Sequence, residues 1–159
     1  MKCIIITVAM LLIFNSGNSQ NYFHLSKSKV KILLQKECTS KNYECVINES
    51  DTSVVLSVVD SSSVLPFKLI CYFNKKGKCM EEVYRSSCDS CSDILVNSWM
   101  KKNINWHKLD STTWLSGMGR NLLLHIIDSK TFSLKHLKPK EYVVVRKRLK
   151  LKKRTNGAS

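Results

Sequence analysis

The middle of the chain alternates apolar and polar residues, which is the period of a half-buried β-strand. Val30, Ile32 and Leu34 alternate with two lysines and a leucine. Residues 53–59 form a short run, mostly β-branched, that ends near a cluster of serines, which is typical of a buried strand. We therefore predict a strand at both places.

The clearest hairpin lies between residues 67 and 84. Residues 67–73 place four apolar side chains on one face, residues 74–77 (Asn-Lys-Lys-Gly) form a turn, and residues 78–84 return. Gly77 is the residue best suited to a positive φ in this turn. A four-residue loop puts Tyr72 opposite Cys79, so that Cys71 and Cys79 point to opposite faces and bond elsewhere. A register shift of one residue reverses that conclusion.

Other segments give weaker patterns. Residues 141–145 (EYVVV) are a strand candidate that runs into a basic segment. Ser92 and Asp93 can cap a helix that runs to Lys102, whereas residues 121–128 are too short to assign from their period. The pattern predicts a mainly β fold, a β-sandwich or β-barrel-like domain, with one or two short helices.

The first 19 residues have the order of a secretory signal. Lys2 precedes an apolar run from residue 3 to residue 14, and small and polar residues follow it. This run is shorter than the ~20 residues that cross a bilayer, and no later stretch approaches that length. We predict removal of residues 1–19, secretion to the extracellular space, and no stable transmembrane span.

Secretion changes the account of the cysteines and of the charge. Cys3 leaves with the signal, and six cysteines remain: Cys38, Cys45, Cys71, Cys79, Cys88 and Cys91. In an oxidising compartment we expect three disulfides among them, with 15 possible connectivities. Loss of Lys2 leaves 25 Lys and Arg against 12 Asp and Glu, a net charge of +13.

The cysteines also bound the domain organisation. We expect one disulfide-stapled domain from residue 20 to residue 145 and a basic tail from residue 146 to residue 159. The spacing lacks the motifs of a growth-factor cystine knot, and every tryptophan follows the last cysteine, which excludes the pinned core of an immunoglobulin domain. Asn48, in Asn-Glu-Ser, is an N-glycosylation acceptor in a secreted chain.

The tail is dense in positive charge. Seven of the nine residues from 146 to 154 are Lys or Arg. If the segment is extended, Leu149 and Leu151 lean on the domain while the cations face the other side. The candidate polyanion-binding residues are therefore Arg146, Lys147, Arg148, Lys150, Lys152, Lys153 and Arg154. A solvated tail without a partner, a nuclear-import signal and a proprotein cleavage site are the alternatives.

Catalytic chemistry has few candidates. A ribonuclease needs an acid–base histidine pair beside a cation, but His125 lies in an apolar stretch, His136 lies among lysines, and His24 and His107 are scattered. Cys88 and Cys91 form only half of a zinc spacing, and no serine-nucleophile or phosphate-loop motif is present. We expect no catalytic residue, no metal site, no cofactor and no enzymatic activity.

These features favour a non-enzymatic, cytokine-like ligand or extracellular modulator. Its folded part would bind an extracellular protein partner or receptor, and its tail would bind heparin-like sulfated glycans or another polyanion. The first alternative is a cationic host-defence or toxin-like protein that acts on membranes or nucleic acid. The second is a secreted ribonuclease-like enzyme.

Overall fold

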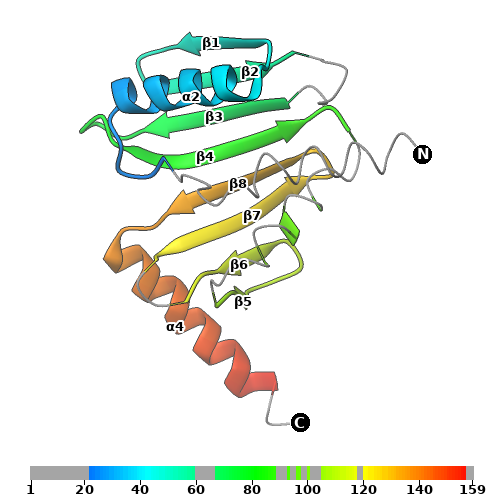
Figure 1. The fold of residues 1–159 in the computed structure, drawn as a ribbon. Helices are drawn as coiled ribbons and strands as arrows, with labels where there is room; N and C mark the ends of the chain where they lie inside the picture. Colours follow the sequence, from blue (N-terminus) through cyan, green and yellow to red (C-terminus); the bar gives the residue numbers. More distant parts are fainter. Residues whose placement is uncertain are drawn as a thin grey trace.

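The strands of the computed structural model form one antiparallel sheet of eight strands (Figure 1). The structure describes residues 22–59, 67–88, 105–117 and 120–156, four residues of a helical segment between 93 and 100, and side chains as far as residue 148. The strand order is β1-β2-β3-β4-β8-β7-β6-β5. A mainly β fold is confirmed, but the described strands form a single open sheet instead of a sandwich or barrel.

Two four-stranded meanders make up this sheet, and they meet where β4 pairs with β8. The strands are β1 (Cys45–Glu49), β2 (Ser53–Val58), β3 (Phe67–Phe73), β4 (Cys79–Ser86), β5 (His107–Lys108), β6 (Thr113–Leu115), β7 (Leu122–Asp128) and β8 (Thr131–His136). The strands predicted at residues 53–59 and 67–73 are confirmed as β2 and β3.

A helical segment precedes each meander. Helix α2 (Lys27–Lys41) comes before β1. Asp93, Val96, Asn97 and Met100 are helical and come before β5, which agrees with the helix predicted between residues 92 and 102. Val96 belongs to the same buried cluster as the inward residues of α2, so both helical segments lie on one face of the sheet.

The strand predicted around Val30 is wrong, because these residues belong to α2. Val30, Leu34 and Cys38 are buried at intervals of four, which is one face of a helix, while Ile32 is 62% exposed. The Ser26 side chain caps the first turn by accepting the Lys29 N–H. Over six residues the apolar positions fit both periods, and only the next buried turn, at Cys38, distinguishes helix from strand.

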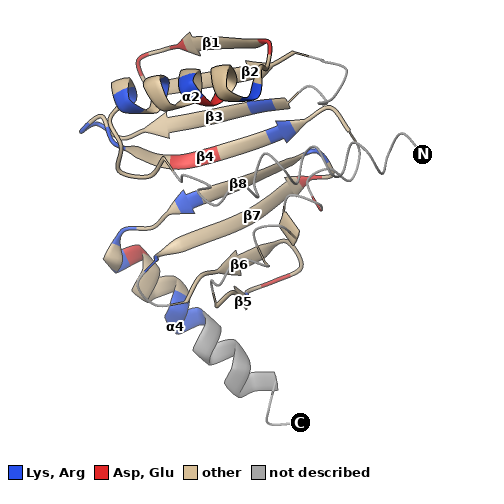
Figure 2. Ribbon diagram, viewed as in Figure 1, with Lys and Arg blue, Asp and Glu red and all other residues tan. Residues whose placement is uncertain are grey.

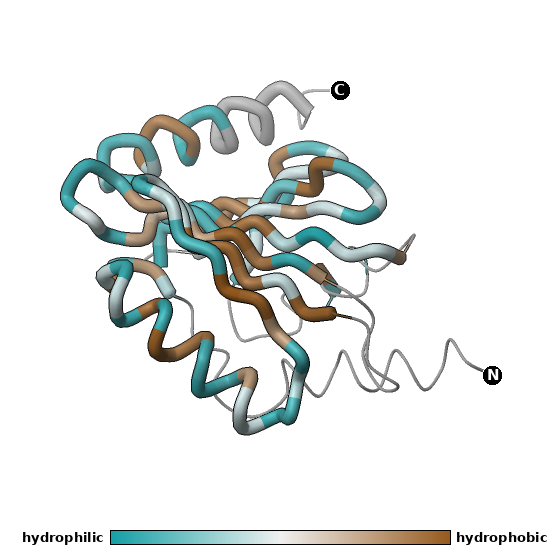
Figure 3. Tube along the Cα trace, turned by 90° about the horizontal axis from the view of Figure 1, so that it is seen from above, coloured by the Kyte–Doolittle hydropathy of each residue, from teal (hydrophilic) through white to brown (hydrophobic). Residues whose placement is uncertain are grey.

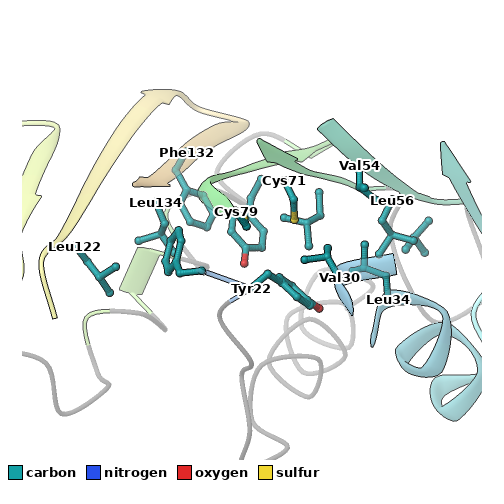
Figure 4. Packing of buried hydrophobic residues seen from close by; sticks show 14 of the residues in the cluster. Tyr22, Val30, Leu34, Val54, Leu56, Cys71, Cys79, Leu122, Phe132 and Leu134 are labelled. Atoms are coloured by element: carbon teal, nitrogen blue, oxygen red, sulfur yellow. The ribbon is translucent and has the colours of Figure 1, made fainter. Parts of the chain in front are cut away.

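The main core lies between α2 and the sheet. Val30 and Leu34 of α2 and Val54 and Leu56 of β2 are almost inaccessible to solvent and face one another across this layer (Figure 4). The same cluster continues along the sheet through Leu69, Cys71, Tyr84, Phe132, Leu134, Leu122 and Leu124. Tyr22 and Phe23, ahead of α2, are also buried in it, so the residues from Tyr22 to α2 are part of the fold.

The strand predicted at residues 141–145 is wrong as well, because helix α4 (Pro139–Asn156) begins there. Proline suits the first turn of a helix, and the Glu141 carboxylate accepts the Lys138 N–H at 2.9 Å. Three consecutive valines resemble a strand, but one side of a helix cannot bury them all. Val143 and Val144 remain 50% and 52% exposed.

Helix α4 packs on the face of the sheet opposite to α2 (Figure 3). On β7, Leu122 and Leu124 belong to the cluster under α2, whereas Leu123 between them packs with Tyr142 of α4. The Tyr142 hydroxyl donates to the Ser116 carbonyl oxygen at 2.9 Å. The two helices therefore cover opposite faces of different halves of the sheet.

The hairpin of β3 and β4 has the predicted turn but a different register. Gly77 adopts a φ of +66°, as the turn requires. A bulge between Tyr72 and Phe73 places Phe73 opposite Cys79. Cys71 and Cys79 consequently share the core face, where both are fully buried. The expectation that they point to opposite faces is wrong.

Candidate functional site

Helix α4 concentrates positive charge. Its 18 residues include eight Lys and Arg and a single acid, Glu141. Residues 146–154 hold seven of these cations within about 12 Å of helix, at ~1.5 Å per residue. The helix continues through the boundary expected between residues 145 and 146. The prediction of an extended tail is therefore wrong, because residues 146–156 belong to a helix.

The lysines of α2 are engaged in the fold. Lys27 and Lys31 pair with Glu49 at 3.7 and 3.3 Å, and Lys41 pairs with Glu37 at 3.0 Å. These pairs connect α2 to β1 or stabilise the helix itself. Much of the positive charge of α2 is thus balanced by carboxylates of the same chain.

The described cations of α4 differ in this respect. Lys147 and Arg148 are exposed, Arg146 is half-buried, and none of the three forms an ion pair with a carboxylate in the described part of the chain. The side chains of Lys150, Lys152, Lys153 and Arg154 lie outside the described residues. Their backbone is helical, which places them one turn or two beyond Arg148.

The first turns of α4 attach the helix to the domain, and the rest of it projects. Tyr142 is buried, and Val145 packs beside it against the second core cluster. Figure 1 shows that α4 then runs past β6 and β5, so that its last turns lie beyond the sheet. In Figure 2, lysine and arginine residues are coloured on α4 as far as residue 148. The N-terminal turns of α4 are thus packed on the domain, and the segment rich in Lys and Arg follows them along the helix.

The cysteines are brought together in neighbouring pairs. Cys38 and Cys45 form a disulfide with a Cα–Cα distance of 6.2 Å, which ties the last turn of α2 to β1. This part of the predicted disulfide framework is confirmed. Cys88 is also disulfide-bonded, and Cys91 lies outside the described residues. Cys71 and Cys79 are neighbouring buried thiols that interact by a hydrogen bond.

Asn48 lies on β1, which is an edge strand of the sheet. Its side chain is exposed, and it points away from α2 because Ile47 beside it packs on the core. The position is open to a glycan, and glycosylation stays a prediction.

His24 and His136 are in direct contact. Their ring centroids are 4.2 Å apart in an edge-to-face arrangement, which leaves no space for a phosphate between the rings. The Nδ1 atom of His136 is buried and has no hydrogen-bond partner in the described structure. Burial, and then the neighbouring His24, lower the pKa of His136.

The other two histidines lie elsewhere. His125 is paired with Ser133 and His136 with Leu122, so the two histidines are on opposite faces of the sheet. His125 shares a hydrogen bond of 3.1 Å with the Thr113 hydroxyl, and His107 is exposed on β5. The structure therefore brings His24 and His136 together and leaves His125 on the other face of the sheet.

A buried acid was missed in the sequence. Glu82 on β4 has no exposed surface, and its carboxylate accepts the Tyr22 N–H at 2.6 Å and the Tyr84 hydroxyl at 2.7 Å. Burial, followed by the Glu82 charge, raises the pKa of Tyr84. The period of two puts Glu82 and Tyr84 on one face, but the pattern did not reveal that this face is the core.

Two cations on the sheet were also missed. Lys68 and Arg85 are directly opposite on β3 and β4. They are 17 positions apart in the sequence, so only the register of the hairpin brings them together. The four-residue turn expected from the sequence pairs Lys68 with Val83, so only the observed register, with its bulge at Tyr72 and Phe73, brings Arg85 opposite Lys68.

Two kinds of feature are absent from the described residues. No group of three or more His, Cys, Asp or Glu is arranged there to hold a metal ion. No helix in that part of the chain is both long and apolar enough to cross a membrane.

Comparison of the chain with protein-family models, with curated proteins and with solved structures finds no match. The assignment of function therefore rests on the chain's own residues and on their arrangement.

Proposed function

We propose that this protein is a secreted, non-enzymatic binding protein that attaches to sulfated glycans or similar polyanions through α4. In this proposal the first 19 residues are a signal peptide, and the folded domain engages an extracellular protein partner. The observation that carries the proposal is the charge of α4, with eight cations against one acid on a helix whose base is docked by Tyr142.

The physical basis is the release of counterions. A polyanion with closely spaced charges holds a layer of small cations, and a dense row of Lys and Arg displaces them with a gain in entropy. Arg146, Lys147 and Arg148 have no carboxylate partner in the described chain, so their charge remains available to an external anion. A helix also fixes the spacing of these charges at little further loss of entropy on binding.

A heparin column tests the proposal. Replacing Lys150, Lys152, Lys153 and Arg154 with Gln keeps good helix formers and should markedly lower the salt needed for elution. The matched control replaces four exposed lysines outside α4, namely Lys29, Lys36, Lys75 and Lys76, with Gln. Both variants lose the same charge, so elution that depends on net charge alone would shift equally in both, and this would contradict the assignment to α4.

A second candidate is supported by two exposed valines. Val143 and Val144 are about half exposed beside Lys147, and an apolar patch next to cations is typical of helices that lie in a membrane interface. This favours the cationic host-defence alternative. Leakage of dye from anionic vesicles, abolished by Val143→Gln with Val144→Gln, would support it. Retention on heparin without leakage supports the first proposal.

A further inference from the structure

One row of residues crosses the sheet on the face opposite to α2. The strand register aligns Ser57, Lys68 and Arg85 on β2, β3 and β4. Residues next to them along the strands, such as Val58 and Leu69, are buried on the other face, whereas Lys68 and Arg85 are exposed. Two cations and a hydroxyl thus lie side by side on the surface of the sheet.

This arrangement is electrostatically unfavourable in the free protein. Like charges directly opposite on neighbouring strands destabilise a sheet. Neither Lys68 nor Arg85 forms an ion pair with a described carboxylate. The charge of Arg85 has little effect on Asp128. The pKa of Asp128 is lowered mainly by the hydrogen bond from the Lys130 N–H, and Arg85 makes the smallest contribution. Both cations therefore keep their charge available for an external anion.

The two cations border a hollow of about 220 Å³. Its lining also includes Ser57, Ser86, Val58 and Phe67. Ser57, in the same row as the two cations, brings a hydroxyl that can donate to a ligand. The hollow is smaller than the ~300–1,000 Å³ of sites for drug-sized molecules, so it suits a single charged group with its immediate attachment.

We propose that this hollow binds one sulfate or phosphate ester carried on a sugar ring. The ester oxygens would lie between the Lys68 ammonium and the Arg85 guanidinium, whose fork of donors matches a tetrahedral oxyanion. The sugar ring follows from the glycan binding proposed above, because Phe67, next to Lys68 on β3, lies on the α2 face and packs on the core. This proposal rests on the polyanion binding proposed above. It adds that one esterified sugar unit of the glycan binds at this hollow, separately from α4.

Nitrogen–proton NMR titrations of the mature protein test the assignment. The probes are N-acetylglucosamine 6-sulfate, N-acetylglucosamine 6-phosphate and unsubstituted N-acetylglucosamine. Saturable shifts should appear at the amides of Ser57, Lys68, Arg85 and Ser86 with an esterified sugar and not with the neutral one. The ester that binds more tightly identifies the natural source as a sulfated or a phosphorylated sugar.

Two variants make the result decisive. Lys68→Gln with Arg85→Gln should weaken binding of the esterified sugar by about tenfold or more, since it removes two charge-assisted contacts. Lys68→Glu should abolish binding while raising the melting temperature, because it replaces a like-charge pair by an opposite one. Unchanged affinity in both variants, or shifts confined to α4, would overturn the proposal. The α4 variant should bind the monosaccharide normally, so failure of this site and failure of the α4 proposal are distinguishable.

Discussion

Glu82 is a carboxylate without exposed surface that holds the start of the described chain in the core. It accepts hydrogen bonds from the Tyr22 N–H and the Tyr84 hydroxyl. In Glu82→Gln, one acceptor oxygen becomes an NH₂ group, so one buried donor loses its partner. We expect a loss of about 1–3 kcal/mol in the free energy of unfolding, measured by urea denaturation.

The neighbouring Glu81 provides the control for this prediction. It lies on the same strand but on the other face, where it is partly exposed. Glu81→Gln should change the free energy of unfolding by no more than about 0.5 kcal/mol. Equal losses in the two variants would show that the buried hydrogen bonds are not what makes Glu82 important.

The stability of the folded protein depends on pH through His136. Its pKa is lowered from 6.5 by burial and by His24, so the folded protein favours the neutral ring. Between the lowered folded pKa and 6.5, the unfolded chain binds more protons. The stabilisation from the neutral ring is therefore complete above 6.5 and is lost as pH falls through the folded pKa.

The corresponding variant is His136→Phe, which keeps an aromatic ring next to Phe23. Urea denaturation at pH 7.5 and at pH 5.5 should show that the wild type loses stability at the lower pH and that the variant loses less. Asp110 and Asp128 do not interfere, because their pKa values are lowered below 3.8. An identical pH dependence in both proteins would contradict the role of this histidine.

At the scale of elements, the β3–β4 hairpin brings Cys71 and Cys79 into contact inside the core. In the oxidising compartment proposed for this protein, their two thiols would transfer two protons and two electrons to an oxidising disulfide, which is reduced to two thiols, and would form a bridge. We predict that the secreted protein contains a Cys71–Cys79 disulfide beside Cys38–Cys45. Closing this short loop should stabilise the fold by about 2–3 kcal/mol.

Peptide mapping without reduction measures this directly. A digest of the secreted protein should contain one peptide pair joined through Cys71 and Cys79, and denaturation without a reductant should expose no thiol at either position. Alkylation of both cysteines in denaturant, or their linkage to other cysteines, would refute the prediction.

Local patterns predicted some elements and failed at others for a physical reason. The strands at residues 53–59 and 67–73 were predicted correctly, because apolar and polar residues alternate along a strand when one face of its sheet is buried. The strands predicted at Val30 and Val143 were wrong, because a short β-branched run fits a strand and a helix with one buried face equally well. What decided both cases was the partner surface, which a single segment does not contain.

At the scale of the whole molecule, long-range contacts place the sites. Pairing of β4 with β8 joins the two meanders, and α4 packs on the face opposite to α2. No local signal predicts either contact. The basic residues from 146 to 154 were found from composition alone, whereas the Lys68–Arg85 pair depends on strand register. The density of charge along the chain can thus be predicted from the sequence, but the arrangement of the charges in space cannot.

The salt dependence of affinity for a heparin oligosaccharide of defined length tests the central claim most directly. Each neutralised anionic group contributes ~0.7–0.9 to the slope of log K against log salt concentration. If α4 is the binding element, replacing Lys150, Lys152, Lys153 and Arg154 with Gln should reduce the slope by about 3, while the four-lysine control outside α4 keeps the wild-type slope. An unchanged slope in the α4 variant, or the same reduction in the control, would contradict the account.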